Sequence, residues 1–261
     1  MGSSGSFYGL SALSPDEIDV ISRSLHGDVR RMPAGIDIVL ADESVSNVFL
    51  VRSGWLASYT ILEDGRRQIT RFWREGDQAG LGYAMASALG VKENGGPGDF
   101  VAPNGCVSVT PVEVEVIAPG RIRALVEEHP KLALKYFTIH SMDHNEMLVR
   151  HLTSVGRQSA HEALAALILE LARREGLHPH AAKRMTVALP LNQTVVADAL
   201  GLTSVHISRV LADFEKRGLI ERQATARAEI VVRDLAGLVE TADMQPYRDW
   251  LERTVSADKS A

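Results

Sequence analysis

Residues 191–211 read LNQTVVADALGLTSVHISRVL, and this stretch decides how the whole chain is interpreted. Asn192 is a polar residue of the kind that caps and starts a short helix, and Gly201 stands where the chain must turn sharply. Thr203 is predicted to cap a second helix. The buried apolar face of that helix is predicted to consist of Ile207, Val210, Leu211 and Phe214. Two short helices around a glycine turn are typical of a helix-turn-helix.

The opposite face of the second helix is predicted to contact DNA. Short side chains let a helix approach the major groove, and Arg209 can bind guanine through O6 and N7. The base-facing residues we expect are Ser204, Val205, His206, Ser208 and Arg209. Phosphate contacts, which position a helix without selecting a sequence, are expected from Gln193, Thr194, Thr203, Arg222 and Arg227. The alternative is an ordinary helical pair in a structural or protein-binding winged domain.

Composition and charge agree with a globular chain that has a polyanionic partner. The 261 residues are 45% apolar and 23% charged, which suits one or two domains with a substantial core. Residues 157–233 carry 11 basic and 8 acidic side chains, in a chain whose net charge is −5. Because Cys106 is the single cysteine, an internal disulfide and a four-cysteine zinc or iron–sulfur site are excluded. With no signal peptide and no apolar stretch of ~20 residues, we expect a cytoplasmic protein without membrane contact.

Three patterns follow one another along the chain. A capping box over residues 14–17 predicts a first short helix. From about residue 30 to 118, short β-prone runs between turns predict an antiparallel barrel or sandwich, with a mobile loop at residues 90–105. Residues 221–232, near the other end, are predicted to form a two-stranded wing.

A long helix is predicted from Pro130 to about Val155, ended by Gly156, and a second amphipathic helix from Ala160 to near Gly176. The stripe of the long helix suits pairing with another helix, and the alternative is a core helix on its own barrel. The stripe expected at the dimer interface is Leu134, Phe137, Ser141, Asn145, Leu148, Leu152 and Val155.

The order of these elements resembles the cyclic-AMP receptor/fumarate-nitrate reduction (CRP/FNR) regulator family over roughly residues 10–240. The segments that carry the resemblance are LGLT at 200–203, ISRVL at 207–211, GLI at 218–220, VRSG at 51–54 and EGD at 75–77. The resemblance implies an α+β chain with an N-terminal antiparallel β-roll sensor of the cyclic-nucleotide-binding kind, a long dimerisation helix and a C-terminal winged helix-turn-helix. It also implies a homodimer that binds an inverted repeat of double-stranded DNA and contacts RNA polymerase.

The chain departs from that family where cyclic AMP would bind. Members that bind it have a glutamate after the glycine that closes the G-D-x-x-G segment, and here Leu81 follows GDQAG at 76–80. Val107 stands where they have an arginine for the cyclic phosphate, and Met147 and Leu148 stand where their dimer helix offers a Thr-Ser pair. Apolar groups would leave the phosphate and hydroxyls of a nucleotide without partners. We therefore expect an effector pocket at Leu81, Val107, Met147 and Leu148 that takes a small apolar effector or none.

The reading face also departs from the family, because Val205 replaces the glutamate of the Glu-x-x-Ser-Arg pattern, while Ser208 and Arg209 remain. Three histidines, His140, His144 and His151, fall within about 40° of one another on an ideal helix. They suggest, as an alternative, a haem- or metal-binding sensor; the simpler interpretation is a polar flank of the helix or a pH-sensitive surface.

The divisions predicted along the chain are a sensor at 1–120, the dimerisation helix at 121–156, the DNA-binding domain at 157–240 and a tail at 241–261. No phosphate loop, nucleophile elbow or H-E-x-x-H metal motif is present, so we predict a regulator and not an enzyme. We expect no cyclic AMP, no iron–sulfur cluster and no metal. A ligand-binding module that does not bind DNA is the remaining alternative.

Overall fold

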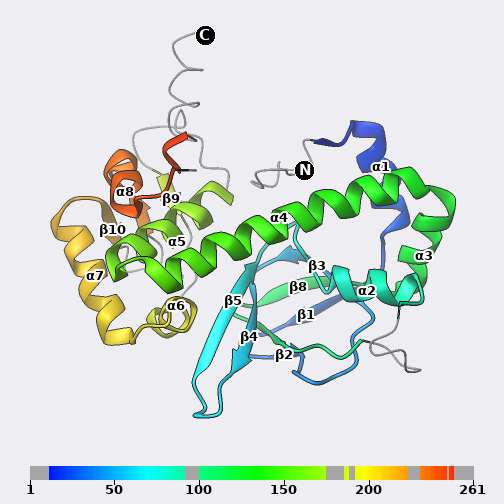
Figure 1. Ribbon diagram of the computed structural model, residues 1–261, viewed down its shortest axis with the longest axis horizontal. Helices are drawn as coiled ribbons and strands as arrows, with labels where there is room; N and C mark the ends of the chain where they lie inside the picture. The colour runs from blue at the N-terminus through cyan, green and yellow to red at the C-terminus, as the bar shows by residue number, and fades with distance from the viewer. Residues whose placement is uncertain are drawn as a thin grey trace, which may run out of the picture. The chain divides into compact units, whose positions relative to one another are not determined.

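The structure is a computed structural model that describes residues 12–91, 100–174, 185–187, 192–222, 230–245 and 247–249 (Figure 1). It divides into two compact units, one of residues 7–147 and one of residues 148–261 together with 1–6. Two predictions fall outside the described residues: the greater part of the loop at 90–105, and Arg227.

The unit of residues 7–147 contains a β-roll of two four-stranded antiparallel sheets (Figure 1). The strand order is β1-β8-β3-β6 in the first sheet and β2-β7-β4-β5 in the second. The strands are β1 Asp28–Met32, β2 Asp37–Val39, β3 Val48–Ser53, β4 Leu56–Ile61, β5 Arg67–Trp73, β6 Gln78–Ala79, β7 Gly105–Ser108 and β8 Val112–Ile117. Apolar side chains from both sheets, including Phe49, Val51, Leu56 and Val114, form the core between them. The predicted antiparallel β structure is confirmed.

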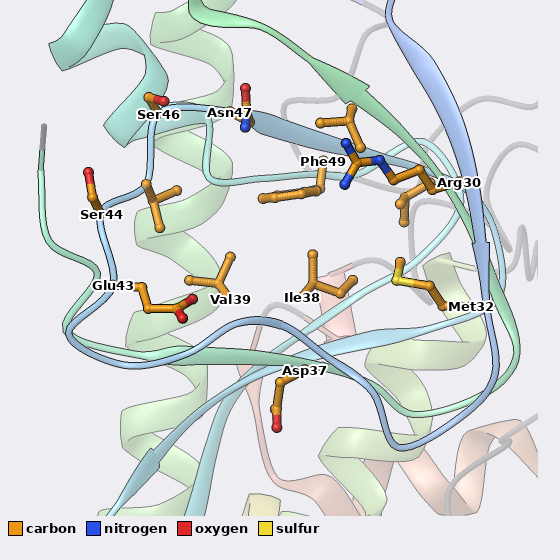
Figure 2. A pocket seen from close by; sticks show the side chains of 13 residues that line it. Arg30, Met32, Asp37, Ile38, Val39, Glu43, Ser44, Ser46, Asn47 and Phe49 are labelled. Atoms are coloured by element: carbon orange, nitrogen blue, oxygen red, sulfur yellow. The ribbon is translucent and has the colours of Figure 1, made fainter.

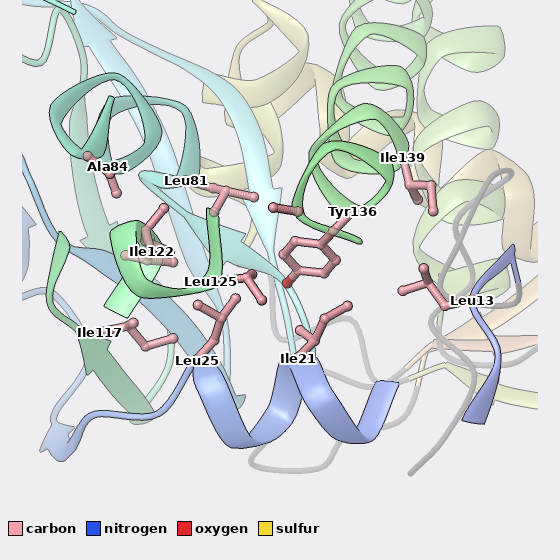
Figure 3. Packing of buried hydrophobic residues seen from close by; sticks show 13 residues of the cluster. Leu13, Ile21, Leu25, Leu81, Ala84, Ile117, Ile122, Leu125, Tyr136 and Ile139 are labelled. Carbon is pink, nitrogen blue, oxygen red and sulfur yellow. The ribbon is translucent and has the colours of Figure 1, made fainter. Parts of the chain in front are cut away.

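Helices cover the other face of the first sheet. They are α1 Pro15–Ser24, α2 Leu81–Ala88, α3 Pro119–Glu128 and the first part of α4 Pro130–Arg157. The predicted capping box is present, with the Glu17 N–H donating to Ser14 Oγ at 3.2 Å and the Ser14 N–H donating to Glu17 Oε2 at 2.7 Å. Figure 3 shows Ile21, Leu125 and Tyr136 of three different helices meeting in one cluster.

The second unit is a helical domain with a small sheet. Its helices are α5 Ala160–Arg174, α6 Gln193–Leu200, α7 Ser204–Lys216 and α8 Leu235–Ala242. Its strands are β9 Met185–Val187, β10 Ile220–Arg222 and β11 Ile230–Val232. α5 packs against both α7 and α8.

Two boundaries differ from the prediction. The wing is three-stranded, in the order β10-β11-β9, because β9 precedes the helix-turn-helix in sequence and pairs with β11 from a distance. α4 continues through Gly156 to Arg157, since a glycine lowers helix stability by about 1 kcal/mol without ending a helix. α4 ends at Arg157, and Ser159 forms a capping box with Glu162 that starts α5.

No single helix among the described residues is long and apolar enough to cross a membrane; α6 and α7 meet that criterion only as a pair, across a bend of 103°.

Candidate nucleic-acid interface

The turn between α6 and α7 is built by three residues at the predicted positions. Asn192 Oδ1 accepts a hydrogen bond from the Val195 N–H at 2.9 Å and so starts α6. Gly201 ends α6 with φ of 65°, a left-handed conformation that glycine adopts without steric cost. Thr203 Oγ1 accepts from the His206 N–H at 3.2 Å and starts α7. The two helix axes meet at a bend of 103°.

The buried face of α7 fixes the helix within its unit. Ile207, Val210, Leu211 and Phe214 are buried, as the apolar spacing predicts. On the side of α5, the His161 ring lies 5.7 Å from the Phe214 ring and His161 Nε2 lies 3.3 Å from Asp213 Oδ2. α7 is thus fixed along its buried face, and the opposite face of its N-terminal half is exposed.

This exposed face of α7 carries the predicted base-facing residues. Ser204, Val205, His206 and Arg209 are exposed, and Ser208 is half-buried. Val205, a large apolar side chain, is 59% exposed. Arg209 makes no hydrogen bond or ion pair with any residue that the structure describes. The guanidinium can therefore reach outward to a base edge.

The residues predicted to contact phosphate differ from one another in exposure and in their hydrogen-bond partners. Thr194 is exposed and Gln193 half-buried in the first turn of α6, where the unpaired backbone N–H groups of a helix favour an anion. The Thr203 hydroxyl caps α7 as an acceptor and still has its own proton to donate. Arg222, by contrast, forms an ion pair with Glu215, and its backbone N–H donates to Glu215 Oε1 at 3.0 Å. The hydrogen bond from Arg222 lowers the pKa of Glu215.

Comparison with known proteins matches this geometry to a known family. Residues 162–241 match the family model described as a Crp-like helix-turn-helix domain. The nitrogen fixation regulation protein FixK of Azorhizobium caulinodans is 29% identical over 197 residues, which cover 76% of this chain and 72% of the relative. The anaerobic regulatory protein of Haemophilus influenzae is 28% identical over 233 residues, covering 87% and 81%. The solved structure of FixK2 from Bradyrhizobium japonicum has a TM-score of 0.68 and 25% identity, covering 84% of this chain and 99% of that one.

Residues 162–241 form a Crp-like helix-turn-helix domain, and the chain is similar over most of its length to regulators of the CRP/FNR family. It is a DNA-binding transcription regulator and not an enzyme, and the predicted resemblance is confirmed.

The long helix α4 has two different faces. Ala133, Tyr136 and Ile139 of α4 are buried in the apolar cluster that also contains residues of α1, α2 and α3. The predicted stripe lies on another face, where Leu134 is 70% and Leu152 is 73% exposed. The remaining stripe residues are Phe137, which is half-buried, and Ser141, Asn145, Leu148 and Val155, which are exposed. The described part of the chain leaves this stripe uncovered, and an exposed apolar stripe is typical of an interaction surface.

The residues predicted for the effector pocket lie on three elements, α2, β7 and α4. Leu81 is buried in the helical cluster, Val107 is buried on β7, Met147 is buried on α4, and Leu148 is 40% exposed. A cavity of about 290 Å³ lies inside the β-roll and is lined by β1, β2, the β2–β3 connection, β3 and β8 (Figure 2). None of the four predicted residues contributes to it.

A buried polar cluster joins β5 to α4, and sequence reasoning did not find it. Arg71 of β5 lies 3.5 Å from Asp143 of α4, with its Cζ 3.9 Å from the Trp73 ring centre and an amino group against the His144 ring. The side chain of Arg71 is 7% exposed and that of Asp143 is 14% exposed. A β-strand arginine carries no sequence signal that it is buried, because its partner lies more than seventy residues away.

Two of the three histidines proposed as ligands belong to this cluster. Burial lowers the pKa of His140 to about 4, and burial with the adjacent Arg71 lowers the pKa of His144 to about 4. His144 also stacks on Trp73, with ring centres 6.3 Å apart. His151 lies two turns further along α4. The part of the chain that the structure describes contains no group of three or more histidine, cysteine or carboxylate side chains suited to a metal.

Cys106 lies in the core between the two sheets. Burial raises the pKa of its thiol to about 12, which disfavours the reactive thiolate.

Proposed function

We propose that this regulator is a homodimer that binds an inverted-repeat DNA site, with α7 of each protomer in the major groove of one half-site. The observation that carries the proposal is the outer face of the N-terminal half of α7, where Val205 and Arg209 are exposed on a helix whose capping and opposite face are fully engaged. A helix held in this way presents its side chains to DNA with little loss of conformational freedom.

The proposed reading residues predict a specific change in preference relative to family members with the Glu-x-x-Ser-Arg pattern. Arg209 retains the guanine, and Val205 contacts a thymine methyl where a glutamate would accept from cytosine or adenine. Each correct base contact is worth about 1–3 kcal/mol against the wrong base.

Selection of binding sites from a random duplex library tests the base contacts proposed for Val205 and Arg209. The unmodified protein is expected to recover a half-site that keeps the guanine and changes the neighbouring base, and Val205→Glu to shift that neighbouring base alone. Arg209→Lys is expected to relax the guanine position, since lysine lacks the bidentate geometry. Lys216→Gln, at the other end of α7, is the control that leaves the recovered sequence unchanged. A glutamate-type half-site selected by the unmodified protein would contradict the proposal.

Phosphate contacts are proposed for Gln193, Thr194, Thr203, Arg222 and, in the wing, Arg227. Binding measured against salt concentration separates such contacts from base contacts, because each neutralised phosphate contributes about −0.9 to the logarithmic slope. If no salt-dependent binding to duplex DNA were measured, the alternative of a ligand-binding module that does not bind DNA would be favoured.

Pairing of the two protomers is proposed to occur along the α4 stripe. The proposed divisions of the chain are the sensor at 1–120, the helix at 121–156, the DNA-binding domain at 157–240 and the tail at 241–261. RNA polymerase is the proposed partner of the DNA-bound dimer.

The sensor is proposed not to bind cyclic nucleotides. Leu81, Val107, Met147 and Leu148 offer no hydrogen bond to a phosphate or ribose, so burying the nucleotide there would cost several kcal/mol, by the rule that buried polar groups need partners. Isothermal titration with cyclic AMP and cyclic GMP tests this, and micromolar affinity for either nucleotide would refute it.

A further inference from the structure

The cavity inside the β-roll has an apolar wall and a charged rim. It measures about 290 Å³, which is at the lower end of the range for small-molecule sites. Its apolar wall consists of Met32, Ile38, Val39, Phe49, Val114 and Val116. All of these residues belong to the unit of residues 7–147, so the cavity is complete within one unit.

Strand pairing aims one arginine into this cavity. Arg30 of β1 pairs with Val114 of β8, and Phe49 of β3 pairs with Val116. Directly paired residues point to the same face of a sheet, so Arg30 shares the inner, apolar face with these side chains. Figure 2 shows the Arg30 guanidinium and the Phe49 ring on the same wall, with Ile38 pointing toward them from β2.

The neighbouring arginine has the opposite orientation. Arg31 points to the outer face, where its Nε donates to Glu113 Oε2 at 2.6 Å. β1 therefore places one arginine in an ion pair outside the roll and the other inside, toward apolar side chains.

The two carboxylates of the cavity lining are already engaged. Asp37 Oδ1 accepts a hydrogen bond from the Tyr59 hydroxyl at 2.8 Å, and in Figure 2 the Asp37 side chain points away from the cavity. Glu43 Oε2 accepts from the Leu40 N–H at 3.0 Å. Arg30 makes no hydrogen bond or ion pair with any described residue. Because Arg30 is exposed at the rim, water satisfies its charge until a ligand replaces that water.

We propose that this cavity binds a small carboxylate with an aliphatic body, the carboxylate on Arg30 and the body on the wall formed by Ile38, Phe49 and Val114. A guanidinium matches a carboxylate in geometry and charge, and the apolar wall supplies the remaining free energy. The site differs from the predicted effector position, because neither α2, α4 nor β7 contributes to it. The proposed carboxylate site does not depend on the proposed recognition of DNA bases by α7.

Methyl-resolved NMR of the full-length protein tests the site with three probes of equal length: hexanoate, 1-hexanol and hexylammonium. The isoleucine and valine methyl groups of the wall report binding at the place proposed. Ligands of this size are expected to bind with a Kd of about 1 mM. Hexanoate is expected to bind about tenfold more tightly than hexanol, and hexylammonium more weakly than both.

The variant Arg30→Gln is expected to reduce hexanoate binding about tenfold, to the level of hexanol, and to leave hexanol binding unchanged. Arg31→Gln, which removes the outward arginine, is the matched control and is expected to change neither. The proposal is overturned if no probe binds, if hexanoate and hexanol bind equally, if Arg30→Gln retains the preference, or if the methyl shifts lie away from Ile38, Val39 and Val114.

Discussion

Replacing Leu152 by alanine tests whether the α4 stripe holds two protomers together. Leu152 is 73% exposed in the single chain, so nearly three quarters of its surface remains for a partner to cover. The substitution removes three carbon atoms, each worth ~0.8 kcal/mol when buried, which gives about 1.8 kcal/mol per protomer. A twofold interface contains the residue twice, so the dimer loses about 3.5 kcal/mol and its dissociation constant rises about 300-fold.

Sedimentation velocity over a dilution series measures this dissociation constant directly. Leu89→Ala is the matched control, because Leu89 is 55% exposed at the end of α2, away from the stripe. The control is expected to leave the constant within about twofold, as surface substitutions usually do. An unchanged constant for Leu152→Ala, or an equal change in both variants, would refute the assignment of the stripe as the interface.

Three further predictions concern the DNA-binding unit and the polar cluster. Thr203→Ala removes the cap of α7 and is expected to lower the free energy of unfolding by about 1 kcal/mol in a denaturant titration, whereas Thr203→Ser retains the cap. Glu215→Gln releases Arg222 and is expected to steepen the slope of log affinity for DNA against log salt concentration by about 0.9. Glu240→Gln removes the same charge without releasing an arginine and is expected to leave this slope unchanged. Burial lowers the pKa of His140 and His144 from 6.5 to about 4, so between these pH values the unfolded chain binds more protons than the folded one. The free energy of unfolding is therefore expected to fall as pH drops from about 6.5 to 4. Urea titrations of His144→Gln over this pH range should show a shallower fall.

The helix-turn-helix could be predicted from sequence because its determinants are local. Asn192, Gly201 and Thr203 act on neighbours within four residues, and each made the backbone contact expected of it. The α4 stripe is local in the same sense, since helical periodicity alone places Leu134 and Leu152 on one face.

The parts that were missed depend on residues far apart in the chain. β9 joins the wing across the entire helix-turn-helix, and Arg71 of β5 meets Asp143 of α4 across more than seventy residues. The predicted effector residues came from alignment with the family and not from packing. The cavity at Arg30 instead follows from the register of β1 against β8, which no local pattern reveals.

The two faces of α4 also show why polar contacts are needed to fix the orientation of the helix about its own axis. Both faces contain leucine-sized apolar groups, and hydrophobic burial is non-directional, so burial alone does not choose which face meets the roll. The Arg71–Asp143 ion pair and the Tyr136–Gln78 hydrogen bond have defined geometry, and each is satisfied in one rotation of the helix. Turning the stripe inward would leave Arg71 buried without its carboxylate, which costs far more than the exchange of one apolar side chain for another. These buried polar contacts therefore direct the stripe outward, where the second protomer is proposed to bind.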